Sequence, residues 1–547
     1  MKRIFTILFA LFLALNLMAV NVWDGSSEPW TNGSGTMEDP YLIETAANLA
    51  YLAEKVNEGY QAQGMAVFKN VYFLMTDDLD LNNINWTPIG NVNMNMEGFY
   101  FAGIFDGWYH NIDHLRIQSN ADVCGLFAGL GGEQGPPPSD LTGQIRHLSV
   151  TNGNITSTGT GVGGIVGGMA GDALVFQCSF SGTISVSNGG SFCGAGGIVA
   201  AAAENTSIVE CSFNGSINAT NSAFTGAAGA GGIVGIAMDN AAISECYNTG
   251  SVTGTAMILS VAAGIVGATL QENNVFVYSC YNVGTLNAAT KGGIFGMVSP
   301  INPMKGEASI GVSNCFYLNT CGGTTAYGTS MTSDEMKTEQ FKNQIDMSSH
   351  SFVMDNGTNN GYPIHSLASF RYYPVTDITC NSAKLSAQIH QGNDDVARAY
   401  FLYKHWEAEE WIEVDVSTDG YVEVILEDLE PETYYEYGLT LMFADGIMMS
   451  GGPRGFQTDV YDAVFDQATS VSVYPNPATD VIYIQGVDAA EVQVFNTLGQ
   501  LVKTVRGTNE VFVSDLPAGT YLLRISTDSA SLREARFLRI PLGMPCR

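Results

Sequence analysis

A pattern of paired glycines, apolar pairs and cysteines recurs through the middle of the chain at a nearly fixed interval. The phrase Gly-Gly-Ile-Val, or a close variant, begins at residues 163, 196, 231, 263 and 292. No helical periodicity interrupts these repeats, and a constant period of this length is typical of stacked repeat architectures. We therefore predict a solenoid in which each repeat forms one coil. Five cysteines keep step with the glycine phrase, at intervals of 33, 35, 34 and 35 residues: Cys178, Cys211, Cys246, Cys280 and Cys315.

Each repeat offers three short strand-forming tracts: the Gly-Ile-Val tract, the tract that leads to the cysteine, and the tract after the next glycine. Residues 242–246 and 250–253 exemplify the last two. Three strands per coil is the plan of a right-handed parallel β-helix, in which matching side chains stack about 4.8 Å apart along the axis. The paired glycines would permit tight turns. An antiparallel sandwich is the alternative, but it would not require the repeats to be alike.

An amphipathic helix is predicted ahead of the repeats, over residues 46–60. Thr45 is a suitable N-cap and Gly59 a suitable stop. Exposed strand edges recruit other chains, so the open end of a solenoid needs a cover. We expect the helix to cap the N-terminal end with its apolar face: Leu49, Leu52, Ala53 and Val56.

The pattern changes near Tyr372 to the alternation that is typical of half-buried strands. The predicted fold class is therefore all-β: a right-handed parallel β-helix with an N-terminal helical cap, followed by two small antiparallel β-sandwiches. The β-helix is expected over residues 20–368, the first sandwich over 370–458 and the second over 470–547.

The first 19 residues have the features of a secretory signal peptide. Met1-Lys2-Arg3 gives a positive start, and residues 4–14 are apolar apart from Thr6. A membrane anchor is the rival interpretation, but the apolar run is short, and no later segment approaches the roughly 20 apolar residues that a span requires. We expect cleavage after Ala19 and export of the chain.

Charge and composition narrow the function. The chain has 22 basic and 54 acidic residues among 547, a formal net charge of −32, and 62 glycines. Such an acidic surface repels phosphate backbones and anionic lipids, so we expect no nucleic-acid partner.

Three segments resemble known families. The repeats, with Asp39-Pro-Tyr-Leu-Ile before them and Asn359-Asn-Gly-Tyr-Pro-Ile after them, resemble the GLUG-motif family of bacterial surface proteins. That resemblance implies a β-helix and no chemistry. Leu429-Glu-Pro-Glu-Thr-Tyr-Tyr435 resembles the tyrosine-corner phrase of fibronectin type III domains, with Tyr435 as the corner residue.

The last segment resembles the C-terminal sorting domain of the type IX secretion system. The resemblance rests on Val473-Tyr-Pro-Asn-Pro-Ala-Thr-Asp480, on residues 492–502 and on Leu516-Pro-Ala-Gly-Thr-Tyr521. It implies export across the outer membrane by that machinery and a location at the bacterial cell surface. The extension Pro541–Arg547 departs from the family's usual short basic end.

Few residues suggest chemistry. His110 and His114 have the spacing of a helical metal pair, but they lie in a strand-like region and no His-Glu-x-x-His motif is present. Asp77, Asp78 and Asp80 alternate with leucines, and a solvated strand face explains them without a metal or an acid–base role.

The repeating cysteines are expected to be buried free thiols, because a ladder along an axis does not converge on a metal. Cys315 and Cys321 are the exception, since a short loop could bring them together as a disulfide. We expect Phe180, Phe213 and Tyr247 to occupy matching places beside the ladder.

The sequence therefore favours a secreted, non-enzymatic cell-surface adhesin or binding protein with an extracellular glycan or protein ligand. It assigns no catalytic, cofactor-binding or metal-binding residue and implies no cofactor. The alternative is a β-helix polysaccharide-degrading enzyme, a lyase or a glycoside hydrolase, which would gather carboxylates in a groove. A third hypothesis is a structural surface-layer component that associates with itself.

Overall fold

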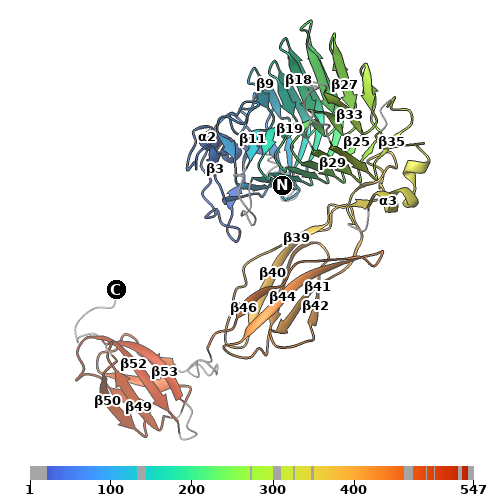
Figure 1. Ribbon diagram of the computed structural model, residues 1–547. Coiled ribbons are helices and arrows are strands. Elements are labelled where there is room, and N and C mark those ends of the chain that lie inside the picture. The colour runs from blue at the N-terminus through green and yellow to red at the C-terminus, as the bar shows by residue number, and fades with distance from the viewer. Residues whose placement is uncertain are drawn as a thin grey trace, which may run out of the picture.

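The computed structural model shows a nearly all-β chain, in which a parallel β-solenoid is followed by two small antiparallel sandwiches (Figure 1). The structure describes residues 21–131, 143–270, 274–299, 309–323, 327–346, 350–460, 472–487, 489–497, 499–527 and 532–539. The predicted signal peptide, residues 1–19, and the extension Pro541–Arg547 lie outside the described residues.

Four parallel sheets run along the solenoid, with 13, 9, 8 and 6 strands. The expectation of three strands per coil is therefore wrong, whereas the parallel stacking of alike coils is confirmed. The strands that the prediction missed form the six-stranded sheet, and their short tracts are rich in glycine and alanine, which have low β-propensity. One coil contains β17 (Ser179–Asn188), β18 (Phe192–Gly196), β19 (Val199–Ala202) and β20 (Ser207–Val209).

The nine-stranded sheet carries one wall of the site described below. Its strands pair in parallel from the first coil to the last. In order they are β2 (Tyr41–Ile43), β4 (Tyr72–Met75), β7 (Ile104–Asp106), β12 (Gln144–Arg146), β16 (Leu174–Phe176), β20, β24 (Ala241–Ser244), β29 (Asn274–Tyr278) and β34 (Ser309–Ser313).

The stacking register places like residues above one another inside the solenoid. Strand β17 pairs with β21 (Ser212–Asn221) over ten residues, so that Phe180 lies opposite Phe213 and Ile184 opposite Ile217. All four of these side chains are buried, and the two phenylalanine rings stack with their centroids 6.3 Å apart. The repeat period of the sequence is thus the length of one coil.

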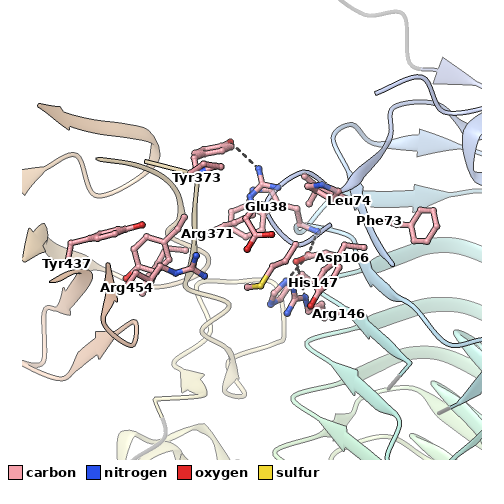
Figure 2. Close-up of a pocket in the computed structure, with 17 residues that line it drawn as sticks. Glu38, Phe73, Leu74, Asp106, Arg146, His147, Arg371, Tyr373, Tyr437 and Arg454 are labelled. Carbon is pink, nitrogen blue, oxygen red and sulfur yellow. Dashed lines mark hydrogen bonds and ion pairs between the residues drawn. The ribbon is translucent and has the colours of Figure 1, made fainter. Parts of the chain in front are cut away.

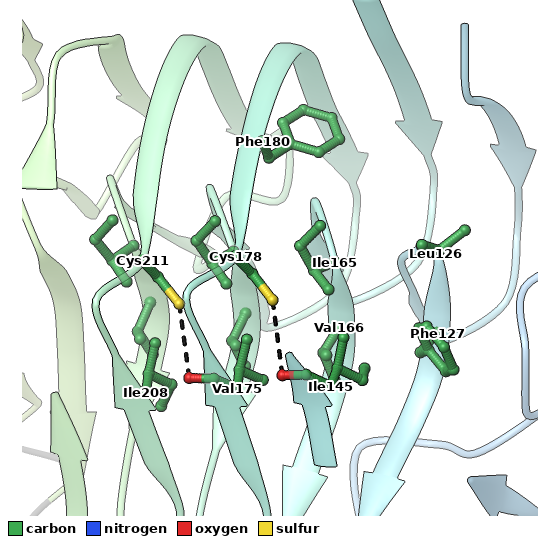
Figure 3. Packing of buried hydrophobic residues seen from close by; sticks show 14 of the residues in the cluster. Leu126, Phe127, Ile145, Ile165, Val166, Val175, Cys178, Phe180, Ile208 and Cys211 are labelled. Atoms are coloured by element: carbon green, nitrogen blue, oxygen red, sulfur yellow. Dashed lines mark hydrogen bonds between the residues drawn. The ribbon is translucent and has the colours of Figure 1, made fainter. Parts of the chain in front are cut away.

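The cysteine ladder is buried in this interior, as expected (Figure 3). The Cys178 thiol lies 3.6 Å from the carbonyl oxygen of Ile145, and the Cys211 thiol lies 3.6 Å from that of Val175, in each case one coil away. Burial raises the pKa of the Cys178 thiol and raises that of Cys193, a buried thiol of β18, to about 12. Cys315 and Cys321 are also buried free thiols, so the structure does not contain the disulfide considered for them.

Tyr247 does not occupy the place of Phe180 and Phe213, and that expectation is wrong. It pairs with Ser212, so its ring lies on the outer face of the solenoid, while Asn248 takes the interior position opposite Phe213. Asn248 and Asn282 are both fully buried, and the amide nitrogen of Asn248 donates to Oδ1 of Asn282 at 2.8 Å. The hydrogen bond satisfies a polar pair that would otherwise be costly in the core.

The predicted helix is present as α2 (Ala46–Asn57) and covers the N-terminal end of the solenoid (Figure 1). Thr45 caps it: its hydroxyl accepts from the backbone N–H of Asn48, and the Asn48 side chain accepts in return from the backbone of Thr45. The apolar face is buried in the solenoid core: Leu49, Leu52, Ala53 and Val56.

A second, unpredicted cover lies on the outer face near the other end. Tyr247 and Tyr281 stack there with centroids 5.0 Å apart. The turn η1 (Glu335–Lys337), the helix α3 (Glu339–Asp346) and the pair β37 (Phe352–Val353) and β38 (Ile364–His365) pack over these rings.

The first sandwich has its own core and contains the expected tyrosine corner. Tyr435 is buried near the start of β44, and its hydroxyl accepts a 2.9 Å hydrogen bond from the backbone N–H of Glu430. One sheet consists of β39 (Ser369–Tyr372), β40 (Ala383–His390) and β43 (Gly420–Leu426). The other consists of β41 (Val396–His405), β42 (Ile412–Val416), β44 (Tyr434–Phe443), β45 (Met448–Ser450) and β46 (Arg454–Gln457).

The second sandwich is smaller and likewise has a core of its own. Its sheets are β47 (Ser472–Tyr474), β48 (Val481–Gln485) and β51 (Glu510–Phe512), and β49 (Glu491–Phe495), β50 (Leu501–Arg506), β52 (Gly519–Ser526) and β53 (Leu532–Arg539).

Thiol labelling tests the buried ladder. Nine free cysteines are described, and Cys380 alone among them is not buried. In a protein with Cys380→Ser and Cys546→Ser, we expect no reaction with a thiol reagent until the fold is denatured, and then reaction of eight thiols. Restoring Cys380 is the positive control, since one thiol should then react in the native state. Rapid native labelling of Cys211 or Cys246 would contradict the register.

Candidate functional site

A cavity of about 280 Å³ lies where the solenoid meets the first sandwich (Figure 2). We call this contact region the seam and this space the seam cavity. The solenoid contributes strands β4, β7 and β12 of the nine-stranded sheet, and the sandwich contributes β39 with one residue each from β44 and β46. The seam cavity is thus built from segments that are far apart in the sequence.

Asp106 organises the solenoid wall. The residue is 5% exposed. Oδ1 accepts from the backbone N–H of Trp108 at 2.9 Å and lies 2.9 Å from Nδ1 of His147, while Oδ2 accepts from Nε of Arg146 at 2.9 Å. Arg146 and Asp106 are register partners in adjacent coils, so coil stacking itself forms this ion pair.

The same contacts fix the charge of Asp106. Burial by itself raises the pKa of the carboxyl group, but His147, Arg146 and the Trp108 amide more than offset it and hold the pKa at about 2. Asp106 is therefore ionised at neutral pH, and in this arrangement it is unsuited to donate a proton to a substrate.

Two arginines line the sandwich side of the seam cavity. The guanidinium of Arg371 lies 5.2 Å from the ring centroid of Trp108 and 4.9 Å from that of Tyr373, and its Nη2 donates to the Tyr373 hydroxyl at 3.0 Å. Arg454 lies 4.6 Å from the ring centroid of Tyr372. Within the described part of the chain, no carboxylate forms an ion pair with Arg371 or Arg454.

A second cavity of about 430 Å³ continues along the seam. It shares Trp108, Arg371 and Tyr373 with the seam cavity and is also lined by polar side chains that include Thr76 and Gln388. We call it the adjacent cavity. The two spaces together provide aromatic faces, hydrogen-bonding groups and fixed cations.

Ring contacts and charged hydrogen bonds hold the seam together. Tyr109 of the solenoid stacks on His390 of the sandwich with centroids 3.9 Å apart. His350, which is 5% exposed, stacks on Phe443, and its Nε2 lies 2.6 Å from Oδ2 of Asp394. These contacts join the sandwich to the solenoid and to the segment that covers it.

Among the candidate residues noted in the sequence, His110 lines the adjacent cavity, and the histidines and aspartates do not form a metal site within the described chain. His110 pairs with Asp78 at 3.1 Å, and His114 pairs with Asp80 at 3.0 Å, so each histidine has a separate partner one coil away. Leu79 and Leu81 are buried on the opposite face. Among the described residues, no group of three or more His, Cys, Asp or Glu side chains is arranged to hold a metal ion.

Sequence reasoning missed the residues of the seam cavity. Asp106, Arg146 and His147 were not singled out in the sequence as candidates for chemistry. Arg146 is the register partner of Asp106 in the next coil, but the two residues are 40 positions apart, which is longer than the 33–35-residue period, so the period did not point to this pair. Nothing in the sequence placed Arg371 and Arg454 against the solenoid.

Residues 472–536 match the secretion system C-terminal sorting domain family. Sorting domains of this family belong to the type IX secretion system, so the match indicates a secreted protein of the cell surface. Among the described helices, none combines the length and the apolar character needed to cross a membrane.

Two relatives match part of the repeat-bearing chain. A protein named as a Gly-rich membrane protein from Evansella cellulosilytica is 32% identical over 178 residues, which cover 31% of this chain and 18% of that protein. Halomucin from Haloquadratum walsbyi is 28% identical over 166 residues, which cover 28% of this chain and 2% of halomucin. The chain therefore spans less than a fifth of either relative.

Two solved structures match parts of the chain at low identity. An IgA1 protease is 18% identical, with a TM-score of 0.36, over 53% of this chain and 20% of that one. A segment of two fibronectin type III domains from chicken tenascin is 17% identical, with a TM-score of 0.17, over 31% of this chain and 96% of that segment. Neither similarity implies an activity for this chain.

The seam should loosen as the pH rises. Burial lowers the pKa of His350, but Asp394, Asp445 and Asp346 more than compensate, and the pKa lies above its ordinary value of 6.5. The protonated ring therefore adds stability that is complete below about pH 6.5 and is lost as the pH rises through the folded-state pKa.

Urea unfolding should show that the wild type has a higher free energy of unfolding than His350→Gln. We expect this difference to shrink between about pH 6 and pH 9. The same substitution made in an Asp394→Asn protein is the matched control and should show a smaller trend, because the carboxylate nearest the ring is gone. A difference that stays constant over this range in the wild-type background would contradict the role of the protonated ring.

Proposed function

We propose that the protein is a non-enzymatic adhesin or binding protein of the bacterial cell surface. The observation that carries this proposal is the seam cavity, which combines aromatic walls and unpaired arginines with an aspartate that is held ionised. Such a site can hold a ligand through charge and ring contacts. Asp106, which Arg146 and His147 hold ionised, is not suited to donate a proton to a ligand in the cavity.

The arrangement of the chain suits display. We propose that residues 1–19 are a signal peptide, that residues 20–368 are a β-helix of the GLUG-repeat kind, and that residues 370–458 are a fibronectin type III-like unit. Residues 470–547 would then be the sorting domain. A rigid solenoid keeps the ligand site at a fixed geometry, because each coil packs on its neighbours.

A polysaccharide-degrading enzyme is the second candidate, and one feature favours it. Glu38 and Asp106 both line the seam cavity. Most glycoside hydrolases cleave their substrates with a pair of carboxyl groups. The ion pair with Arg146 weakens this alternative, because it keeps Asp106 from acting as the acid. Release of reducing ends or of unsaturated products from glycans would establish it.

Binding to an array of extracellular glycans and matrix proteins tests the proposal. We expect the secreted protein to be retained by at least one class of ligand without any change in the ligand's chain length. The variant Asp106→Asn should disturb the wall of the site and alter that retention by about tenfold, since it leaves Arg146 without its charged partner. Chain cleavage by the wild type that Asp106→Asn abolishes would instead favour the enzyme.

Deleting the residues after Thr469 should change the destination and spare the fold. The coils of a solenoid contact mainly their neighbours, and the second sandwich has a separate core, so the truncated protein should fold normally. Fractionation of a host with a type IX system should find it in the periplasm and the intact protein at the cell surface. Surface delivery of the truncated protein would show that the sorting segment is dispensable.

A further inference from the structure

We propose that the seam cavity and the adjacent cavity together bind an acidic oligosaccharide, with its carboxylate held by Arg371 and Arg454. This inference rests on the proposed function and names the class of ligand. Its first support is the distribution of arginine. Residues 21–458 contain five arginines, namely Arg116, Arg146, Arg371, Arg398 and Arg454, and three of them line the seam cavity.

The local charge opposes that of the whole chain. The residues that line the seam cavity include Arg146, Arg371 and Arg454, against the carboxylates Asp106 and Glu38, so histidines aside the balance is +3 − 2 = +1. The entire chain has a net charge of −32. Asp106 is already committed to Arg146 and His147, which leaves Glu38 as the one carboxylate that faces two unpaired guanidinium groups among the lining residues.

Arg371 has hydrogen-bonding capacity to spare. Its Nε is buried and has no acceptor among the described residues, while Nη2 is held by Tyr373. The ring centroids of Trp108 and Tyr373 lie 5.2 and 4.9 Å from the guanidinium carbon, and these contacts limit its movement. A guanidinium whose position is fixed in this way is suited to bind a planar carboxylate through two parallel hydrogen bonds.

The shape of the site favours a saccharide over an isolated anion or an acidic peptide. The seam cavity, about 280 Å³, is close to the lower end of the range for small-molecule sites, which is roughly 300–1,000 Å³. The adjacent cavity continues from it past Trp108 and Arg371, so a second unit of a chain can follow the first. Thr76, Gln388 and His110 line this second space and can exchange hydrogen bonds with sugar hydroxyl groups.

Calorimetry with the full chain tests the assignment. The probes are trigalacturonate, its neutral counterpart trigalactose, a sulfated galactose trisaccharide and a glutamate pentapeptide. We expect trigalacturonate to bind and trigalactose to bind more weakly by about tenfold or more, with affinity falling as salt is raised because the charges lie at an exposed seam. Equal binding of trigalactose would overturn the carboxylate assignment. Preference for the sulfated sugar or for the peptide would overturn the stated class.

Four variants distinguish the site from a structural contact. Arg371→Gln and Arg454→Gln should each weaken trigalacturonate binding by about tenfold, and Arg398→Gln, whose ion pairs lie on the sandwich surface, should leave it unchanged. Glu38→Gln should tighten binding, since it removes a like charge from the cavity.

If the two arginines instead serve the fold, Arg371→Gln and Arg454→Gln would lower the thermal midpoint and leave binding intact, which would overturn the proposal. The protein could instead retain neutral glycans or proteins, with no effect of either arginine variant. That result would also overturn the proposal, but it would support the proposed binding function. If the protein bound no ligand at all, both the proposed binding function and the assignment of an acidic oligosaccharide would be overturned.

Discussion

The close approach of backbones at the glycine corners is the constraint on which the rest of the structure depends. Each corner joins the six-stranded sheet to the eight-stranded sheet. A Cβ atom on Gly197 would lie 2.0 Å from the carbonyl oxygen of Gly232, and one on Gly232 would lie 2.1 Å from that of Gly264. These glycines do not have a positive φ, so the requirement is for space between coils. Any larger residue would push neighbouring coils beyond strand spacing.

The geometry of the seam cavity depends on this spacing between neighbouring coils. Asp106 and Arg146 meet because their strands stack in register, and the buried ion pair then fixes the wall against which the first sandwich docks. The sandwich adds Arg371 and Arg454 to the one arginine of the solenoid wall, Arg146, which is paired with Asp106. A positive recess on an acidic molecule is thus produced by joining two units, neither of which carries it alone. This division explains why a repeat architecture that has little chemistry of its own can acquire specificity.

Much of the fold could be predicted because short segments of the sequence determine it. The period of the glycine phrase predicted the coils. Thr45 and the apolar face predicted the helix, and Tyr435 predicted the tyrosine corner of the first sandwich. The fourth strand was missed because its glycine and alanine residues have no strand signal of their own. Tyr247 was misplaced because a one-residue change of phase moves a side chain to the other face of a strand. The contacts between the solenoid wall and the first sandwich could not be predicted, since they join residues more than 200 positions apart, as in the stacking of Arg371 on Trp108.

The thiol ladder has a consequence for how the chain reaches its folded state outside the cell. Its cysteines complete the core as small apolar groups, each separated from the next by the spacing of a coil, and the described chain contains no cross-link. Folding of the solenoid therefore needs neither an oxidant nor an isomerase to sort partners. The described fold can therefore form in a reducing or in an oxidising medium.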